Sequence, residues 1–567
     1  MATLNKKIKR EADAIDNRII EVLKTGNSFI VEAGAGSGKT YSLLKVIDWL
    51  EYNKCDEYRN KKKNIACITF TNAAVNVILE RLSPDSSIVP STIHSFAWKS
   101  ISSYQQNIIQ YIEELNLLPQ DCTIDQVKSV EYSLGTKYIE KGVLYLFHND
   151  VIKLFAKFLD NKKFRRLLSL KYPIILIDEY QDSFKIITDK FIEHFVEGSN
   201  SIQFGFFGDS WQTIYASNGA CGKIESKKLV EIRKNLNFRS NVAVVNVLNA
   251  IRPDFQQEAV DQRNDGQVIV ITTQDYKGIR QSGKNKSELQ QDDLINYITT
   301  VKKSLEQKWN GKVKTLMITH KMLANQQHYP KVLDIMGDSF KEQSNEYILF
   351  FKNIIEPLYK SLHNGNINEL CDVLKTHRTP IENKLQKKSW SLLYEALREA
   401  REKKIIDVLE VCFDNPQIVP IPSAITDSYK AYLLNNNSIY KKISLSELFN
   451  IDYSEIINAI AFISPESDYS TEHGVKGEEY ENVLFIIGRG WNNYKFDKQV
   501  YLNPESLSEK EYAVYLRNRN LFYVCCSRSI KRLALFITVP INTEFQSYLE
   551  RLVNKTNIIT YSQFIEQ

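Results

Sequence analysis

The sequence predicts an α/β protein with two parallel β-sheets, each interrupted by a helical insertion. Short apolar runs that end in small or acidic residues alternate with stretches of helical periodicity, which is typical of parallel sheets covered by helices. Their near-continuous apolar character predicts strands buried on both faces. Six runs are the clearest, at residues 28–34, 64–72, 172–180, 201–209, 313–320 and 481–488. The segments at 100–170 and about 325–465 are helical and polar instead, and we interpret them as the insertions.

Composition indicates a multidomain globular protein. The 567 residues correspond to about three to five domains. A hydrophobic content of 43% and a charged content of 25% exclude a disordered chain. The net charge of +5 is too small to indicate nucleic-acid binding by itself. The eight cysteines include no C-x-x-C pair, so no zinc site is expected, and Cys525 and Cys526 lie in an apolar, strand-like run expected in the core.

The N-terminal residues favour a protein that is not exported. They are charged throughout and lack the apolar centre of a signal peptide. The longest apolar runs are far shorter than the ~20 residues that a membrane span requires. We therefore expect a cytoplasmic protein with reduced thiols and no membrane association.

A glycine-rich loop, AGAGSGKT at residues 33–40, follows the first predicted strand and precedes a helical stretch. Glycines let successive backbone N–H groups converge on phosphate oxygens, a lysine reaches the terminal phosphates, and a threonine hydroxyl binds Mg²⁺. The alternative is a glycine-rich helix start with a solvated lysine. Ala33 stands where the usual motif has its first glycine. The predicted nucleotide-binding residues here are Gly34, Ala35, Gly36, Ser37, Gly38, Lys39 and Thr40.

Two adjacent carboxylates, Asp178 and Glu179, end the apolar run in LIDEYQD at residues 176–182. Such a pair at the end of a buried strand is costly unless a cation or a reaction uses it. In a P-loop site Asp178, together with Thr40, would hold the Mg²⁺ shell, and Glu179 would polarise the attacking water. The alternative is a solvated turn.

Eight blocks in the chain resemble, in order, the motif series of the UvrD/Rep/PcrA-type superfamily 1A DNA helicases. Beside the P-loop and LIDEYQD they are ITFTNAAVNVILER (68–81), STIHSFA (91–97), GDSWQTIYA (208–216), NFRS (237–240), TEHGVKGEEY (471–480) and RNLFYVCCSRS (519–529). Because they extend from residue 33 to 529, the resemblance covers nearly the whole chain.

The resemblance implies two RecA-like motor domains with ATP bound in the cleft between them. The first would comprise residues 1–98 and 168–235, with a helical insertion at 99–167. The second would comprise 236–325 and 466–567, with a helical insertion at 326–465. Both insertions are short for this family, which places processive unwinding by the isolated chain in doubt.

The resemblance also assigns roles around the nucleotide. Gln212 would report on the γ-phosphate, whereas Arg239 and Arg528 would stabilise negative charge that spreads in the transition state. Glu479 occupies the place of the family's ribose-binding acid, and Phe238 can stack on the base. The simpler alternatives are a loop glutamine, surface ion pairs and a carboxylate at a helix start.

Single-stranded DNA would cross both motor domains. The implied DNA-binding residues are Thr69, Thr71, Asn72, Thr92, His94, Ser95, Phe96 and His473, any of which could instead cap a helix. The sequence departs from the family pattern at Ala73, Ile93 and Ser217, so three expected DNA contacts are weakened or moved. Trp98 and Trp211 could replace the lost stacking surfaces, although burial in the core is an equal alternative.

Three functions remain open from the sequence. The first is an ATP-dependent 3′→5′ DNA helicase or translocase that uses ATP and Mg²⁺. The second is a nucleotide-gated, DNA-sensing ATPase that regulates a partner nuclease, as in Gabija-type antiviral defence. Because no nuclease motif is recognisable in the chain, DNA cleavage would need that partner. The third is an inactive scaffold, which the complete set of catalytic side chains disfavours.

The base-recognition element of the family is missing. Such helicases read adenine with a glutamine about 20 residues before the P-loop lysine, but the first glutamine here is Gln105. The expected region holds Asp16, Asn17 and Arg18 instead. We therefore expect weak discrimination between ATP and GTP, unless Asn17 replaces the missing amide.

Overall fold

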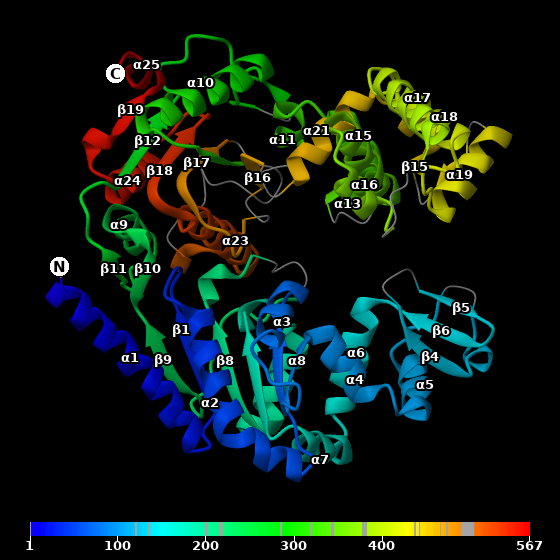
Figure 1. The fold of residues 1–567 in the computed structure, drawn as a ribbon. Helices are drawn as coiled ribbons and strands as arrows, with labels where there is room; N and C mark the ends of the chain where they lie inside the picture. Colours follow the sequence, from blue (N-terminus) through cyan, green and yellow to red (C-terminus); the bar gives the residue numbers. More distant parts are fainter. Residues whose placement is uncertain are drawn as a thin grey trace.

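The computed structural model describes most of the chain. The described residues are 2–567, apart from 120–121, 134–136, 199–201, 215–218, 284–285, 318–319, 342–344, 377–380, 382, 436–437, 441–442, 465–466, 472–474 and 489–503. Two six-stranded parallel sheets form the centres of two RecA-like motor domains, one above the other in Figure 1. The predicted fold class is confirmed.

The first sheet belongs to the N-terminal half of the chain, and all its pairings are parallel. Alternate residues of each strand face opposite cores: Phe29 and Val31 pack against the first two helices, whereas Ile30 faces the other side. In spatial order the strands are β3 (Ile88–Thr92), β2 (Ile65–Thr69), β7 (Ile174–Asp178), β8 (Gln203–Gly208), β1 (Phe29–Ala33) and β9 (Val230–Lys234). Its helices include α1 (Ala2–Lys24), α2 (Lys39–Asn60), α3 (Asn72–Leu79) and α8 (Lys185–Phe191).

The segment between β3 and β7 forms the first insertion. It contains helices, as predicted, and also a small sheet in which β6 pairs with β4 and β5. These strands escaped prediction because runs of three or four residues carry too little periodicity. The elements are α4 (Ile93–Ile101), α5 (Gln105–Glu114), β4 (Ser129–Tyr132), β5 (Tyr138–Glu140), β6 (Val143–Leu146), α6 (His148–Leu159) and α7 (Lys162–Lys171).

The second sheet lies in the C-terminal half and is also parallel throughout. Its strands, in spatial order, are β16 (Tyr469–Thr471), β13 (Lys314–Met317), β17 (Tyr480–Ile487), β18 (Ser529–Ile537), β12 (Gln267–Thr272) and β19 (Ile558–Thr560). The helices around it are α9 (Val242–Ile251), α10 (Gln291–Trp309), α23 (Glu509–Cys526), α24 (Thr543–Leu552) and α25 (Tyr561–Glu566). A separate parallel pair, β10 (Leu236–Asn241) and β11 (Glu258–Asp261), lies between the two motor domains.

All six predicted runs form strands. One expectation was wrong: Cys525 and Cys526 end helix α23 rather than lying in a strand, although both are fully buried as expected. Helix and strand cannot be distinguished in a short apolar run, and here the neighbouring residues continue the helix.

The second insertion is a helical lobe with its own hydrophobic core. In Figure 1 both insertions extend from the same side of the motor domains. The elements are α11 (His320–Gln326), α12 (Pro330–Met336), α13 (Asp338–Lys341), α14 (Glu346–Phe350), α15 (Glu356–Asn364), α16 (Ile367–Val373), α17 (Lys384–Ala400), α18 (Ile405–Asp414), α19 (Ser423–Leu434), β14 (Ile439–Tyr440), β15 (Ile443–Ser444), α20 (Leu445–Phe449) and α21 (Tyr453–Ile463). The domain boundaries given above stay predictions.

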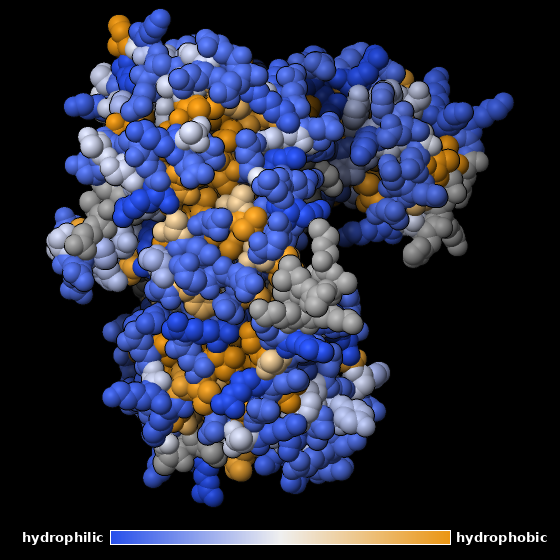
Figure 2. Space-filling model, turned by 90° about the vertical axis from the view of Figure 1, so that its left-hand side faces the viewer, coloured by the Kyte–Doolittle hydropathy of each residue, from blue (hydrophilic) through white to orange (hydrophobic). Residues whose placement is uncertain are grey.

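Among the described helices, none combines the length and the apolar character needed to cross a bilayer. Figure 2 shows the face of the motor domains that lies away from the insertions in Figure 1. Its margins are largely hydrophilic, and apolar side chains gather along its middle in both halves.

Candidate nucleotide site and nucleic-acid interface

The glycine-rich loop joins β1 to α2 and lies directly against the second half of the chain. Gly36 and Gly38 have φ angles of 72° and 74°, which favour glycine. A Cβ atom on Gly36 would lie 2.6 Å from the Cβ atom of Arg239, so the close approach also requires glycine. The side-chain oxygen of Ser37 is buried without a hydrogen-bond partner. Such an orphaned polar group, beside the free N–H groups at the start of α2, fits a phosphate ligand.

Lys39, the first residue of α2, points to the acidic pair at the end of β7. Its Nζ atom lies 2.5 Å from Oε1 of Glu179. Burial opposes the lysine charge, but Glu179 and Asp178 more than offset this and raise the pKa of Lys39. Lys39 is therefore a cation that is already paired with Glu179. A bound phosphate would have to displace Glu179 or bind beside it.

Glu179 is held in an unusual conformation. Its φ of 49° places a non-glycine residue in the left-handed region, and Gln181 Nε2 donates to its carboxylate at 2.5 Å. Burial disfavours the charge, yet Lys39 and Lys476 keep the pKa of Glu179 below its usual value. Burial raises the pKa of the adjacent Asp178 despite Lys39. The two neighbouring carboxyls thus have different acidities, and Glu179 is the stronger acid of the two.

The residues expected to hold Mg²⁺ fit that ion chemically. Asp178 ends β7, and Thr40 lies in the exposed first turn of α2 beside the loop. Both offer hard oxygen ligands, which Mg²⁺ prefers, and it is commonly held by one or two carboxylates plus substrate phosphates. The part of the chain that the structure describes contains no group of three or more metal-ligating residues. The predicted protein ligands of Mg²⁺ stay the Asp178 carboxylate and the Thr40 hydroxyl.

Gln212 lies where the two motor domains meet. It follows β8, and its Nε2 atom donates to Asp209 at 2.8 Å. Its side-chain oxygen accepts from Arg528 at 3.4 Å, and its backbone oxygen accepts from Lys476 at 2.8 Å. Lys476 also pairs with Asp182, which follows the acidic pair. Gln212 is therefore connected to both motor domains.

Arg528 is the most deeply buried cation of the site, with 1% of its surface exposed. Its guanidinium donates to the backbone oxygens of Val524 and Glu478 and to the side chains of Ser527 and Gln212. No carboxylate among the described residues pairs with it. Burial and the nearby Arg239 lower the pKa of Arg528 to about 10. A buried guanidinium with only neutral acceptors lacks an anion.

Arg239 and Glu479, predicted to bind different parts of the nucleotide, bind each other. Arg239 Nε donates to Glu479 Oε2 at 2.7 Å, and Nη1 donates to the backbone oxygen of Ser527 at 3.3 Å. For both predicted roles to hold, this ion pair has to open when a nucleotide binds.

Phe238 and Tyr41 flank the end of the P-loop. A Cβ atom on Gly38 would lie 3.9 Å from both side chains, which are 48% and 60% exposed. The backbone N–H of Phe238 donates to Gly36 at 2.9 Å. Phe238 was predicted, whereas sequence reasoning missed Tyr41. An aromatic residue directly after the Gly-Lys-Thr triplet is the signal that could have indicated it.

A second group of missed residues joins the P-loop strand to the second motor domain. Arg252, at the end of α9, donates to Glu32 and to Asp209 at 2.8 Å each. The ring of Tyr523 lies beside this arginine, and its hydroxyl accepts from the backbone N–H of Ala35 at 3.2 Å. Arg252 falls in none of the eight motif blocks, so no sequence motif indicated it.

Several predicted DNA-binding residues cap helices. The Thr71 hydroxyl accepts from Ala74 N at the start of α3, and the Thr92 hydroxyl accepts from Ser95 N at the start of α4. The Thr69 hydroxyl donates to the backbone oxygen of Thr71. Asn72 and Ser95 are exposed on these first turns. The five side chains therefore lie at the carboxyl ends of neighbouring parallel strands, and their role with DNA stays a prediction.

Phe96, which was predicted to contact DNA, presents no free ring face in this structure. Only 2% of the residue is exposed, because its ring packs against Phe155 and Tyr172 in the core. Buried Trp211 likewise offers no free face, since the Arg519 guanidinium covers its ring at 3.6 Å. Trp98 is partly buried against the core of the first domain. Neither tryptophan is an open stacking surface in this structure.

His94 is a poor electrostatic contact for phosphate. Burial and the neighbouring His148 lower the pKa of His94 to about 4, so the imidazole is neutral at pH 7. Its Nε2 atom is buried without a partner. His473 and Ser217 lie outside the described residues.

Comparison with known proteins agrees with the resemblance of the motif blocks to DNA helicases. A model of the AAA domain matches residues 16–218. The chain is 22% identical to the Gabija protein GajB of Bacillus cereus strain HuB5-5, over 96% of this chain and 98% of that protein. It is 27% identical to GajB of strain VD045, over 45% of this chain and 52% of that protein. It is 26% identical to the ATP-dependent DNA helicase Rep of Buchnera aphidicola, over 40% and 43% respectively.

The motif order and the two parallel sheets agree with these similarities. The P-loop and the acidic pair come from one sheet, while Arg239 and Arg528 come from the segments around the other. The chain is therefore similar to the UvrD/Rep-type superfamily 1 helicases in its motif order, its two parallel sheets and its sequence.

Proposed function

We propose that the chain is an ATP-driven motor that moves 3′→5′ on single-stranded DNA. The observation that carries the proposal is Arg528, which is fully buried, has no acidic partner among the described residues and reaches Gln212 of the opposing motor domain. An anion that binds beside Gln212 would supply the missing negative charge. Nucleotide binding would then draw the two domains together, and loss of the γ-phosphate would release them.

The roles of the surrounding residues follow from their contacts. Lys39 and the loop N–H groups would hold the phosphates, and Glu179, charged and held by Gln181, would accept a proton from the attacking water. Mg²⁺ held by Thr40 and Asp178 would neutralise part of the phosphate charge. Arg528, joined by Arg239 after its separation from Glu479, would stabilise the charge that spreads in the transition state.

Movement on DNA would be coupled through Gln212. Its backbone oxygen accepts a hydrogen bond from Lys476, which lies in the TEHGVKGEEY segment (471–480). Lys476 also pairs with Asp182. A shift of Gln212 on phosphate loss would therefore reach both the acidic strand end and the segment after β16. The predicted DNA residues at the ends of β2 and β3 lie in the same domain as this strand.

The test compares ATP hydrolysis and strand displacement in the wild type and Glu179→Gln. We expect single-stranded DNA to stimulate hydrolysis and unwinding to require a 3′ overhang. Glu179→Gln should retain ATP and DNA binding but lose turnover by orders of magnitude, because the amide cannot accept the proton. Wild-type turnover in this variant would refute the assigned base, and equal activity on 5′-tailed DNA would refute the polarity.

A second candidate function is a DNA-sensing ATPase that regulates a partner nuclease in cytoplasmic antiviral defence. The observation that favours it is the similarity to a Gabija protein over nearly the full length of both chains, whereas the match to Rep covers 43% of that helicase. A strand-displacement and cleavage assay with and without a nuclease encoded beside this gene distinguishes the two. Displacement by the isolated chain supports the motor, and DNA cleavage that needs both proteins and ATP supports the regulator.

A further inference from the structure

A large cavity separate from the P-loop lies between the two motor domains. Its volume is about 1070 Å³, at the upper end of the range for small-molecule pockets. Its lining includes Trp211 and Thr213 from the loop after β8, and Tyr512, Tyr515 and Arg519 from α23. None of the P-loop residues, the acidic pair or Arg528 lines it. The cavity is thus distinct from the P-loop, although Glu32, Arg252 and the loop after β8 border both.

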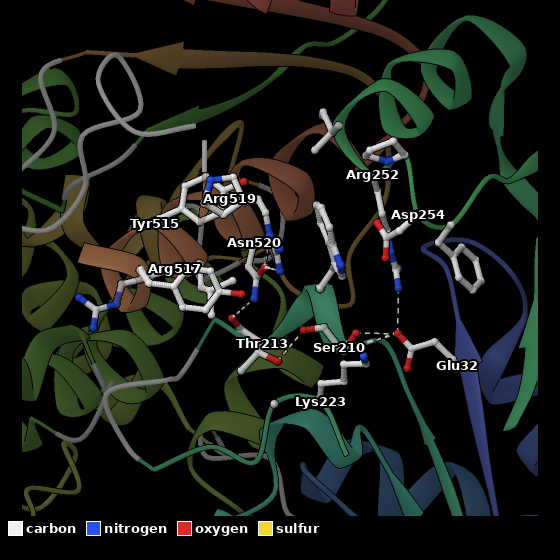
Figure 3. A pocket seen from close by; sticks show the side chains of 18 of the residues that line it. Glu32, Ser210, Thr213, Lys223, Arg252, Asp254, Tyr515, Arg517, Arg519 and Asn520 are labelled. Carbon is white, nitrogen blue, oxygen red and sulfur yellow. Dashed lines mark hydrogen bonds and ion pairs between the residues drawn. The ribbon is translucent and has the colours of Figure 1, made fainter. Parts of the chain in front are cut away.

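The cations around the cavity fall into two groups. Three are neutralised in ion pairs with acids: Lys223 with Glu225, Arg233 with Glu231, and Arg252 with Glu32 and Asp209. Figure 3 shows the Arg252–Glu32 contact at one side of the cavity.

The second group is Arg517, Arg519 and Arg551, and none of these has an acidic partner within ion-pair distance among the described residues. Among the described lining residues, Asp254 is the acid without an ion pair, and its charge acts on Arg519. The lining therefore carries an excess of unpaired positive charge.

Arg519 is the best-placed of these cations. Its guanidinium lies 3.6 Å from the centre of the Trp211 ring, and it donates to the side-chain oxygen of Asn520 at 2.9 and 3.1 Å. It is also hydrogen-bonded to the side chain of Tyr515. Asn520 in turn donates to the backbone oxygen of Thr213 at 3.1 Å, which fixes the geometry. Among the described residues, none of the hydrogen-bond acceptors of Arg519 is a carboxylate. Burial lowers the pKa of Arg519, although Tyr515, Tyr512 and Asp254 partly oppose this. Arg517 points away from the other labelled residues in Figure 3.

Aromatic rings lie beside this cation. Tyr512 and Tyr515 are stacked at 6.2 Å, and Tyr512 is 41% exposed. Aromatic faces stack on nucleobases, and guanidinium groups bind phosphates. The two features occur together on one helix, α23, facing one cavity.

We propose that this cavity binds a nucleoside phosphate, with its phosphate on Arg519 and its base against the tyrosine pair. The ligand is a free nucleotide or a nucleotide within a single strand, since both present the same phosphate and base. The volume is sufficient for either. The inference does not depend on the proposed motor function, because the site shares no ligand-binding residue with the P-loop.

The test uses the full chain with Lys39→Ala, so that the P-loop no longer competes for the probe. Titration calorimetry measures binding of AMP, of 5′-phosphorylated thymidine tetranucleotide and of inorganic phosphate. We expect AMP or the tetranucleotide to bind more tightly than inorganic phosphate, because phosphate lacks a base. AMP alone would identify a free nucleotide as the ligand, and the tetranucleotide alone would identify a strand.

Two further substitutions in this background locate the site. Arg519→Gln, and independently Arg551→Gln, should weaken binding at least tenfold, with melting temperatures measured to exclude unfolding. Arg263→Gln is the matched control, because this arginine pairs with Asp261 and does not line the cavity. Absence of binding of both nucleotide probes at millimolar concentration would overturn the proposal, as would binding that is unchanged in both folded arginine variants.

Discussion

The two faces of the nucleotide cleft differ in how their charges are balanced. On the P-loop face the cation Lys39 has an acidic partner, Glu179, at 2.5 Å. On the opposing face Arg528 is buried among neutral acceptors only. The first face is electrostatically complete in this structure, whereas the second lacks an anion. The comparison teaches that, in the proposed function, an incoming phosphate would replace an existing partner on one side and supply a missing one on the other.

Arg239 is intermediate between these cases. It comes from the same side as Arg528, yet it has an acidic partner in Glu479, which is about half exposed. An exposed pair of this kind is weak and exchanges readily. The opposing face therefore combines one fixed cation with one that has to change partner.

The largest expected effect belongs to the cation without an acidic partner. Arg528→Ala should lower kcat for ATP by about 10³-fold, in the range found for arginine fingers. Arg528→Lys should recover little of this, because an ammonium cannot reproduce the fork of hydrogen bonds. Steady-state hydrolysis with saturating single-stranded DNA measures the effect, beside melting curves. A loss of less than tenfold in a folded variant would contradict the role assigned to the opposing face.

Lys39→Ala should act on binding and have a smaller effect. It removes a charge-assisted contact worth about 3 kcal/mol, so ATP affinity should fall by about 100-fold. The same change also frees Glu179, whose pKa should then rise towards its ordinary value because Lys39 no longer favours the charge. Equilibrium binding of a fluorescent ATP analogue tests this. Lys45→Ala serves as the control, since this α2 lysine pairs with Asp13 and Asp16 instead. Equal losses in both variants would indicate a general effect on α2.

Base recognition should be weak, with ATP preferred over GTP by tenfold or less. Phe238 and Tyr41 offer aromatic surfaces that distinguish purines poorly. Asp16 cannot read the base because it is buried between Ser42, Lys45 and Lys234. Asn17 is exposed on α1 and remains the alternative reader. The ratio of kcat/KM for the two nucleotides decides: a hundredfold preference would refute the prediction, and its loss in Asn17→Ala would identify the reader.

The smallest effect is expected for Glu479→Gln. The variant loses a hydrogen bond to the ribose, worth about 1 kcal/mol, but it also releases Arg239 from an exposed ion pair of similar strength. KM for ATP should therefore change by less than about fivefold. A much larger rise would show that Glu479 contributes to binding alone, and that the pair with Arg239 is not a competing state.

Local sequence pattern was sufficient to predict that the proposed catalytic residues of the first domain lie together. Each predicted run formed its strand, and Lys39, Asp178 and Glu179 meet as expected because parallel strands end at the same edge of a sheet. Pattern failed for the small sheet β4–β6, whose strands are only three or four residues long. It also failed for Phe96, because a motif gives a residue's neighbours in sequence but not the direction in which its ring packs.

The sequence alone determined the fold class, the family resemblance and the residues that can do chemistry, because these depend on spacing within short segments. Only the tertiary structure decided which of them meet. The contact of Arg528 with Gln212 spans 316 positions in sequence, and the pair of Arg239 with Glu479 spans 240. The exposure of Tyr41 beside Phe238, the Arg252 bridge and the cavity around Arg519 likewise depend on segments brought together by folding. Burial removes water from such contacts, so the charge balance that distinguishes the two faces exists only after the domains have packed together.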